Sequence, residues 1–157
     1  MRQTYWALHL GKVLFTAICI AVVLPARAQS DWLTVVGFPD DPAIDLVQVQ
    51  LGSRPLGPDL QNINLRVNRA LTRTSTDGVV FRSFTATAVV DCLAKNGRFM
   101  TSAFYTLPLW QGEPHRTLTF SPTEVRPMLF RNIDPNPTER IVRAACSVAT
   151  RAIPNAR

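Results

Sequence analysis

Histidine and cysteine are scarce in this 157-residue chain, which contains two histidines and three cysteines. Only His115 lies beyond the first 28 residues, and no Cys-x-x-Cys pair occurs, so the spacing that holds zinc is missing. The chain also lacks a Gly-x-Ser-x-Gly nucleophile motif and a glycine-rich phosphate loop. These absences predict a protein without a metal site or a cofactor, and they argue against an enzyme.

Long apolar runs are missing except near the N-terminus, where residues 13–24 are apolar. This run is shorter than the roughly 20 residues that a membrane-spanning helix needs. The basic residues Arg2 and Lys12 precede this run, and the small-residue cleavage site Ala26-Arg27-Ala28 follows it. This is the order of a secretory signal peptide. We therefore expect residues 1–28 to be a signal peptide that meets the membrane only before cleavage. The mature protein is then exported to the periplasm, the cell surface or the medium.

Lysine is nearly absent, so arginine carries almost all of the positive charge. The chain has 17 basic and 11 acidic side chains. Arg2, Lys12 and Arg27 leave with the signal peptide, so 14 basic side chains remain, of which only Lys95 is a lysine, and the net charge is +3. This charge is too small to predict nucleic acid as a partner. Arginine binds carboxylates and sulfates through two nitrogens, so the pattern is compatible with an acidic partner or with an ordinary solvated surface.

Two cysteines remain in residues 29–157, whose length suits a single domain. Cys19 lies in the expected signal peptide, and the bulky residue before it does not fit a lipid-attachment site. Cys92 and Cys146 are therefore expected to form a disulfide in an oxidising compartment. Closing a loop of this length stabilises a fold by about 4 kcal/mol in the chain-entropy description.

Six segments of the mature chain have the composition or the alternation of β-strands. The clearest is 63–68, where apolar and polar residues alternate strictly. Short turns between neighbouring segments make the strands antiparallel. The expected strands cover residues 32–37, 44–49, 63–68, 79–92, 99–107 and 115–120.

One helix is expected near the C-terminus. Asn136 is a good N-cap, Pro137 fits the first helical position and Glu139 stands three residues after the cap. The apolar face of this helix consists of Ile141, Val142, Ala145, Cys146 and Ala149. The predicted fold class is α+β, with an antiparallel sheet of about six strands and one C-terminal α-helix packed on it through the disulfide.

Four side chains are candidates for contact with a partner. Arg66 and Arg82 lie on expected strands, where their guanidinium groups can meet carboxylates or sulfates. Tyr105 and Trp110 lie near a loop rich in proline and glycine, where aromatic side chains often contribute to interfaces. Packing in the core is the alternative for both aromatic residues.

Other polar residues are weaker candidates for chemistry. His115 is expected on the surface of a strand. Asp45 and Asp91 lie on separate expected strands and form a paired-acid site only if the fold brings them together. A carboxylate at the end of a strand or in a turn is the alternative for each.

The order of these motifs resembles that of the surface-adhesin protein E-like domains of Gram-negative bacteria. The resemblance covers 32–146 and rests on five features, which are Trp32, Ile44-Asp45, Phe81-Arg82-Ser83 running to Asp91-Cys92, Phe104-Tyr105 with Trp110-Gln111-Gly112, and Pro137 through the helix to Cys146. It implies a six-stranded antiparallel sheet with a disulfide-fixed helix. It also implies a dimeric surface protein that binds host matrix and serum components. The chain departs from the founding member in lacking a lipid-attachment cysteine and lysine-rich segments.

These observations favour an exported, non-enzymatic binding protein that is similar to bacterial adhesins and binds host extracellular-matrix or serum proteins. The alternative is a periplasmic protein that binds a small ligand or inhibits an envelope enzyme. A groove lined by apolar and arginine side chains favours the small-ligand alternative, whereas a flat exposed edge carrying Tyr105 or Trp110 favours protein binding.

Overall fold

The computed structural model of the chain describes residues 31–50 and 56–151. The expected signal peptide, residues 1–28, and its cleavage site lie outside the described residues. Among the residues that are described, no helix is long and apolar enough to cross a membrane.

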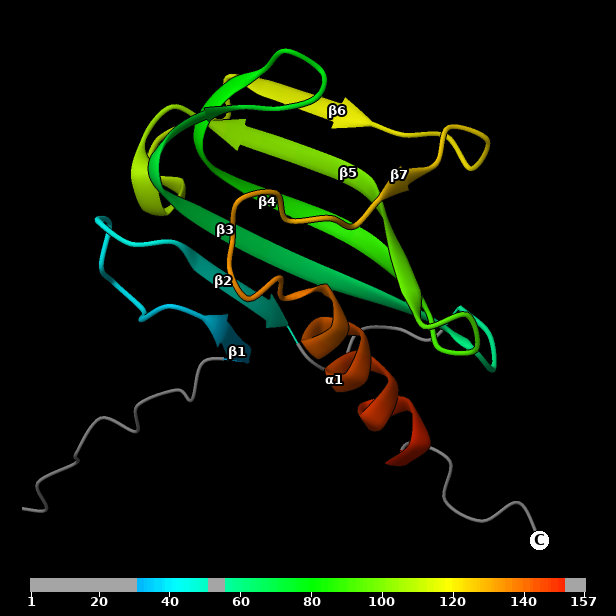
Figure 1. Ribbon diagram of the computed structural model, residues 1–157. Helices are drawn as coiled ribbons and strands as arrows, with labels where there is room; N and C mark the ends of the chain where they lie inside the picture. Colours follow the sequence, from blue (N-terminus) through cyan, green and yellow to red (C-terminus); the bar gives the residue numbers. More distant parts are fainter. Residues whose placement is uncertain (1–30, 51–55, 152–157) are drawn as a thin grey trace, which may run out of the picture.

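The strands form one antiparallel meander in which each strand pairs with its neighbour in the chain (Figure 1). Its strands are β1 (Trp32–Val36), β2 (Leu46–Gln50), β3 (Leu60–Thr74), β4 (Val80–Asp91), β5 (Asn96–Tyr105), β6 (Arg116–Thr119) and β7 (Arg126–Pro127). The order across the sheet is β1 to β6, and β7 pairs with β5 at residues 98–99, beside the part of β5 that pairs with β6. The α+β class and the antiparallel sheet of about six strands are therefore confirmed, with the two-residue β7 as an addition.

The longest strand, β3, extends well beyond the alternating segment 63–68 that marked it in the sequence. Residues 64–68 pair with β2 on one side, and the pairing with β4 reaches from Leu60 to Thr74 on the other. The register with β4 shifts between Asn68 and Arg73. A bulge of this kind breaks the alternation of apolar and polar side chains, so the second half of β3 does not look like a strand in the sequence.

Helix α1 (Thr138–Arg151) begins as its sequence predicts. The Thr138 amide donates to Asn136 Oδ1 at 3.0 Å, so Asn136 caps the first turn. The side chains of Ile141, Val142 and Ala145 are buried against the sheet. The side chain of Ala149, which was expected on the same face, lies outside the described residues.

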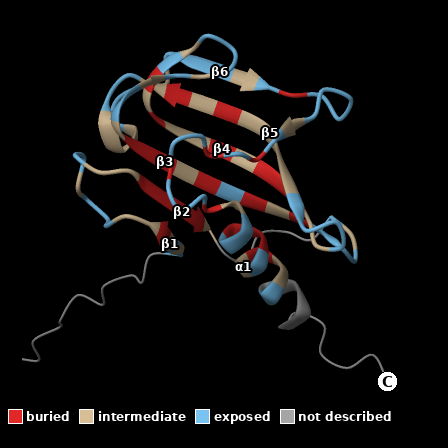
Figure 2. Ribbon diagram, viewed as in Figure 1, coloured by how far each residue is buried: buried red, intermediate tan, exposed pale blue. Residues whose placement is uncertain are grey.

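The core lies between the sheet and the layer formed by α1 and the segment that leads into it. In Figure 1 this segment, drawn in orange after β7, crosses in front of β4 and β3 before α1 begins. It contributes Met128, Phe130 and Ile133 to the core, and Figure 2 shows the buried positions along the strands behind it. Cys92 follows β4 directly and forms a disulfide with Cys146 on α1, with the Cα atoms 5.6 Å apart. The predicted disulfide is confirmed, and it fixes α1 to the end of β4.

Candidate functional site

Polar side chains cross the face of the sheet that points away from α1. Ile63, Leu65 and Val67 belong to the core cluster, so the alternate residues Asn64 and Arg66 point to the opposite side. The strand register extends this second set across six strands, β1 to β6. We call it the open face, and it consists of Trp32, Gln48, Gln50, Asn64, Arg66, Thr85, Thr87, Thr101, Ala103 and Thr117.

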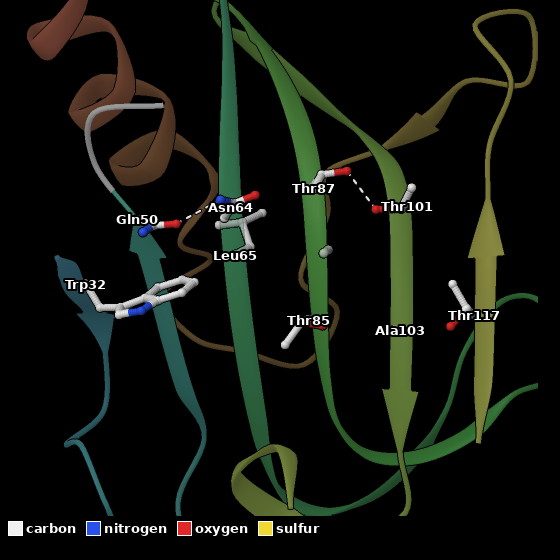
Figure 3. Close-up of a pocket in the computed structure, with 10 residues that line it drawn as sticks. Trp32, Gln50, Asn64, Leu65, Thr85, Thr87, Thr101, Ala103 and Thr117 are labelled. Carbon is white, nitrogen blue, oxygen red and sulfur yellow. Dashed lines mark hydrogen bonds between the residues drawn. The ribbon is translucent and has the colours of Figure 1, made fainter. Parts of the chain in front are cut away.

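The open face is hollowed at its centre, where a depression has a volume of about 270 Å³. Figure 3 shows the Trp32 indole reaching from β1 toward β3 at one side of the hollow, with threonines of β4, β5 and β6 across from it. Two cross-strand hydrogen bonds order its floor, from Asn64 Nδ2 to Gln50 Oε1 at 2.8 Å and between the hydroxyls of Thr87 and Thr101 at 2.7 Å. The surface therefore offers hydroxyl and amide groups that are already held in place.

A cation lies between two indole rings at the edge of this hollow. The guanidinium carbon of Arg66 is 4.4 Å from the ring centroid of Trp32 and 4.6 Å from that of Trp110. Cation–π contacts of this kind contribute about 0.5–2 kcal/mol each, depending on how far the cation is desolvated. Arg66 Nε also donates to Gln48 Oε1 at 2.6 Å. The guanidinium is therefore fixed in one orientation before any partner binds.

Trp110 is positioned by the short 3₁₀ turn η1 (Pro108–Trp110), which folds over the end of the open face. Its indole Nε1 donates to the Phe84 carbonyl at 3.1 Å, and its backbone amide donates to Ser83 Oγ at 3.0 Å. The amide of Leu109 donates to Asn68 Oδ1 at 3.0 Å. Leu109 and Trp110 have φ values of 51° and 59°, a backbone conformation that residues other than glycine rarely adopt. The hydrogen bonds therefore hold a strained turn in place.

The charge of Arg66 is partly desolvated. Burial lowers the pKa of its guanidinium below the usual value, and the nearby Asp40 carboxylate acts in the opposite direction. Arginine remains protonated at neutral pH even so. Of the three guanidinium nitrogens of Arg66, only Nε forms a hydrogen bond with residues 31–50 and 56–151. The two terminal nitrogens are therefore available to an acceptor. An oxyanion that binds there meets a partly desolvated cation.

The four predicted partner-binding residues take different places. Arg66 and Trp110 come together in the stack, and Trp110 is half-buried. Tyr105 lies opposite Ser83 at the end of β5 and is half-buried, but it does not line the hollow. Arg82 donates to the Pro42 carbonyl at 2.9 Å and lies outside the hollow.

Sequence reasoning missed Trp32 and the threonines as parts of this surface. Trp32 marks the first strand in the sequence, but its contact with Arg66 depends on the register of β1 and β2. Alternation within β4 and β5 identifies single polar positions. Only the cross-strand register brings Thr87 and Thr101 together.

The weaker candidates for chemistry have structural contacts. Asp45 forms an ion pair with Arg69 and accepts a hydrogen bond from the Ala70 amide, while Asp91 accepts one from the Ala94 amide. His115 is exposed, and its backbone amide donates to a carbonyl of β5. No group of three metal-ligating side chains comes together in the part of the chain that the structure describes.

Comparisons of the chain with protein-family models, with curated proteins and with solved structures find no match.

Proposed function

We propose that the mature chain is an exported, non-enzymatic binding protein whose open face binds an anionic macromolecule. The observation that carries the proposal is the stack of Arg66 between Trp32 and Trp110 at the edge of a polar hollow. Two indoles hold the cation in a fixed orientation. A carboxylate or sulfate of the partner accepts from its terminal nitrogens, which form no hydrogen bond with residues 31–50 and 56–151.

The rest of the hollow suits an extended polar chain. Its threonine, asparagine and glutamine side chains offer donors and acceptors in rows about one strand spacing apart, roughly 4.8 Å. Trp32 adds an apolar wall on one side. A partner with alternating oxyanions and hydroxyls or amides, such as a sulfated polysaccharide or an acidic protein segment, matches this arrangement.

Export and location are part of the same proposal. The signal-peptide pattern of residues 1–28 and the Cys92–Cys146 disulfide both support an oxidising compartment, in the periplasm or at the cell surface. The resemblance to surface-adhesin protein E-like domains supports host extracellular-matrix or serum proteins as partners. It also supports a homodimer.

The direct test measures binding of residues 29–157 to immobilised laminin, vitronectin and heparin. We expect binding to at least one of them, and we expect Arg66→Gln to weaken it by about ten-fold because a charge-assisted hydrogen bond is lost. Arg140→Gln is the matched control, since Arg140 is exposed on α1, on the other side of the sheet. Absence of binding to all three, together with purely periplasmic fractionation, would favour the small-ligand or inhibitor alternative.

A further inference from the structure

A second cavity lies on the other side of the sheet, beside the segment that leads into α1. Its volume is about 510 Å³, within the range of roughly 300–1,000 Å³ that is typical of small-molecule sites. Strands β3, β4 and β5 form its floor, and the chain from Arg126 to Asn132 passes along its side. None of the described residues lines both this cavity and the hollow of the open face.

The wall of this cavity is aromatic. Six phenylalanines line it, namely Phe81, Phe84, Phe99, Phe104, Phe120 and Phe130. Five of these rings pack against one another, with centroids 5.2 Å apart for Phe81 and Phe104 and 6.1 Å apart for Phe99 and Phe130, while the Phe120 ring lies against the Arg126 guanidinium. Rings that are held by their neighbours give a preformed apolar surface, so an apolar ligand enters without reorganising the wall.

The rim of the cavity is strongly basic. Arg69, Arg73, Arg126 and Arg131 line it, and among the described residues Asp77 is the single acidic one in the lining. Arg126 forms ion pairs with Asp77 at 2.5 Å and with Glu124 at 3.1 Å. These pairs neutralise only part of the positive charge at the rim.

Two of these arginines, Arg69 and Arg73, lie on β3. Arg69 is buried, donates to the Asn132 carbonyl at 3.0 Å and lies 3.4 Å from Asp45. Burial lowers the pKa of Arg69. The Asp45 carboxylate acts in the opposite direction, and the neighbouring Arg73 lowers the pKa by a smaller amount. Arg73 has no hydrogen bond or ion pair among the described residues 31–50 and 56–151, although its Nε is buried. Arg73 lines the cavity and is half-buried, so its guanidinium can form charge-assisted hydrogen bonds with an oxyanion that enters.

We propose that this cavity binds one small amphipathic carboxylate, with its hydrocarbon or aromatic body against the phenylalanines and its carboxylate on Arg73. Arg69, held by Asn132 and partly neutralised by Asp45, is a second guanidinium near Arg73 in the lining of the cavity. Apolar walls favour an uncharged body, and the basic rim requires a negative head. The chemistry of the cavity therefore selects a fatty acid or an aromatic acid over a neutral or cationic amphiphile. This site is separate from the open face and does not depend on the function proposed for it.

The test is calorimetric titration of residues 29–157 with dodecanoate below its critical micelle concentration. Dodecanol and dodecyltrimethylammonium, which have the same tail and a different headgroup, are titrated in parallel. We expect one dodecanoate per chain and at least about ten-fold weaker binding of the two other amphiphiles, since each lacks a charge-assisted bond to arginine. Equal affinity for all three, or no binding of dodecanoate, would overturn the proposal.

Two variants test whether dodecanoate binds in this cavity. Arg73→Gln should weaken the binding of dodecanoate by about ten-fold. Arg143→Gln, at an exposed position of α1, should leave the affinity within about two-fold of wild type. Because Arg73 makes no bond within the described residues, its replacement is expected to leave the melting temperature unchanged. Equal effects of both variants, or no effect of Arg73→Gln in a folded protein, would show that dodecanoate does not use this cavity. Binding to the macromolecules at the open face is measured separately, so either proposal can fail while the other stands.

Discussion

Cys92, the first residue after β4, is joined to Cys146 in the third turn of α1, with their Cα atoms 5.6 Å apart. The bond connects the end of the central hairpin to the helix that covers one face of the sheet. It closes a loop with a sequence separation of 54 residues. Strands β5 to β7, the segment before α1 and the first turns of α1 therefore lie within one covalent ring.

The first prediction concerns the stability that this ring provides. Replacing both cysteines by alanine should lower the free energy of unfolding by about 4 kcal/mol, because the unfolded chain regains its loop entropy. Denaturant unfolding of the oxidised protein and of the double variant measures the difference. Thiol labelling of the unfolded, unreduced mature protein should find no reactive cysteine, and two labelled thiols would contradict the pairing.

A second prediction tests the packing of α1. Val142 is 6% exposed and lies in the core, whereas its neighbour Arg143 is exposed. Val142→Asp should destabilise the fold by about 3–5 kcal/mol, because it places an unpaired charge in an apolar environment. Arg143→Asp is the matched control and should change stability by less than about 1 kcal/mol. Similar melting temperatures for both variants would mean that this face of α1 does not pack on the sheet.

The sequence contains enough to predict the fold but only part of the site. Strict alternation identifies 63–68, the Asn136 cap identifies the helix start, and counting cysteines outside the expected leader identifies the disulfide. Each of these signals is local or involves very few partners. Strand β7 has two residues and no periodicity, so no local pattern indicates it.

The contacts that make the site are set by register and by a strained turn. Arg66 is a recognisable candidate because it is a cation on a strand, but its stacking partner Trp32 is two strands away. Trp110 reaches Arg66 only because η1 adopts positive φ angles, which its sequence does not predict. The phenylalanines of β4 and β5 lie on strands that the sequence predicts. The cavity that they border depends on where the chain after β7 passes.

The third prediction concerns the buried asparagine under η1. Asn68 is fully buried, and its amide group donates to Ile44 and Pro42 and accepts from Leu109. Asn68→Ala leaves these backbone groups unpaired and should destabilise the fold by about 2–4 kcal/mol. It should also change the fluorescence of Trp110, which follows Leu109 in the turn.

Asn64 on the same strand is the control for this variant. It is exposed and its bond to Gln50 is accessible to water, so Asn64→Ala should cost less than about 1 kcal/mol. An Asn68→Ala protein as stable as wild type would show that η1 is held by other contacts.

A fourth prediction measures the stack itself. A double-mutant cycle with Trp32→Leu and Arg66→Gln should give a coupling energy of about 0.5–2 kcal/mol in stability, as expected for a partly desolvated cation–π pair. The same cycle with Trp32→Leu and Arg143→Gln pairs residues that lie on opposite sides of the sheet, so the two effects should add within about 0.5 kcal/mol. Additive effects in the first cycle would mean that the proximity of Arg66 to Trp32 contributes nothing to the fold.

The last prediction concerns the salt dependence of macromolecular binding. If arginines of the sheet contact carboxylates or sulfates, binding to matrix protein or heparin should weaken as salt rises, because exposed charges are screened beyond about 8–10 Å. Arg66→Glu combined with Arg82→Glu should weaken it further, since each substitution replaces an attraction by a repulsion.

The single variants separate the contributions of these two arginines. Arg66 lines the open face, whereas Arg82 bonds to Pro42 outside the hollow, so Arg66→Glu should account for most of the loss. The measurement is affinity at low and at physiological salt for wild type, both single variants and the double variant, with melting temperature as the check on folding. A larger effect of Arg82→Glu would shift the binding surface away from the hollow and toward the loop at Pro42. Binding that does not depend on salt would show that neutral contacts of the threonine and amide rows, rather than the arginines, hold the partner.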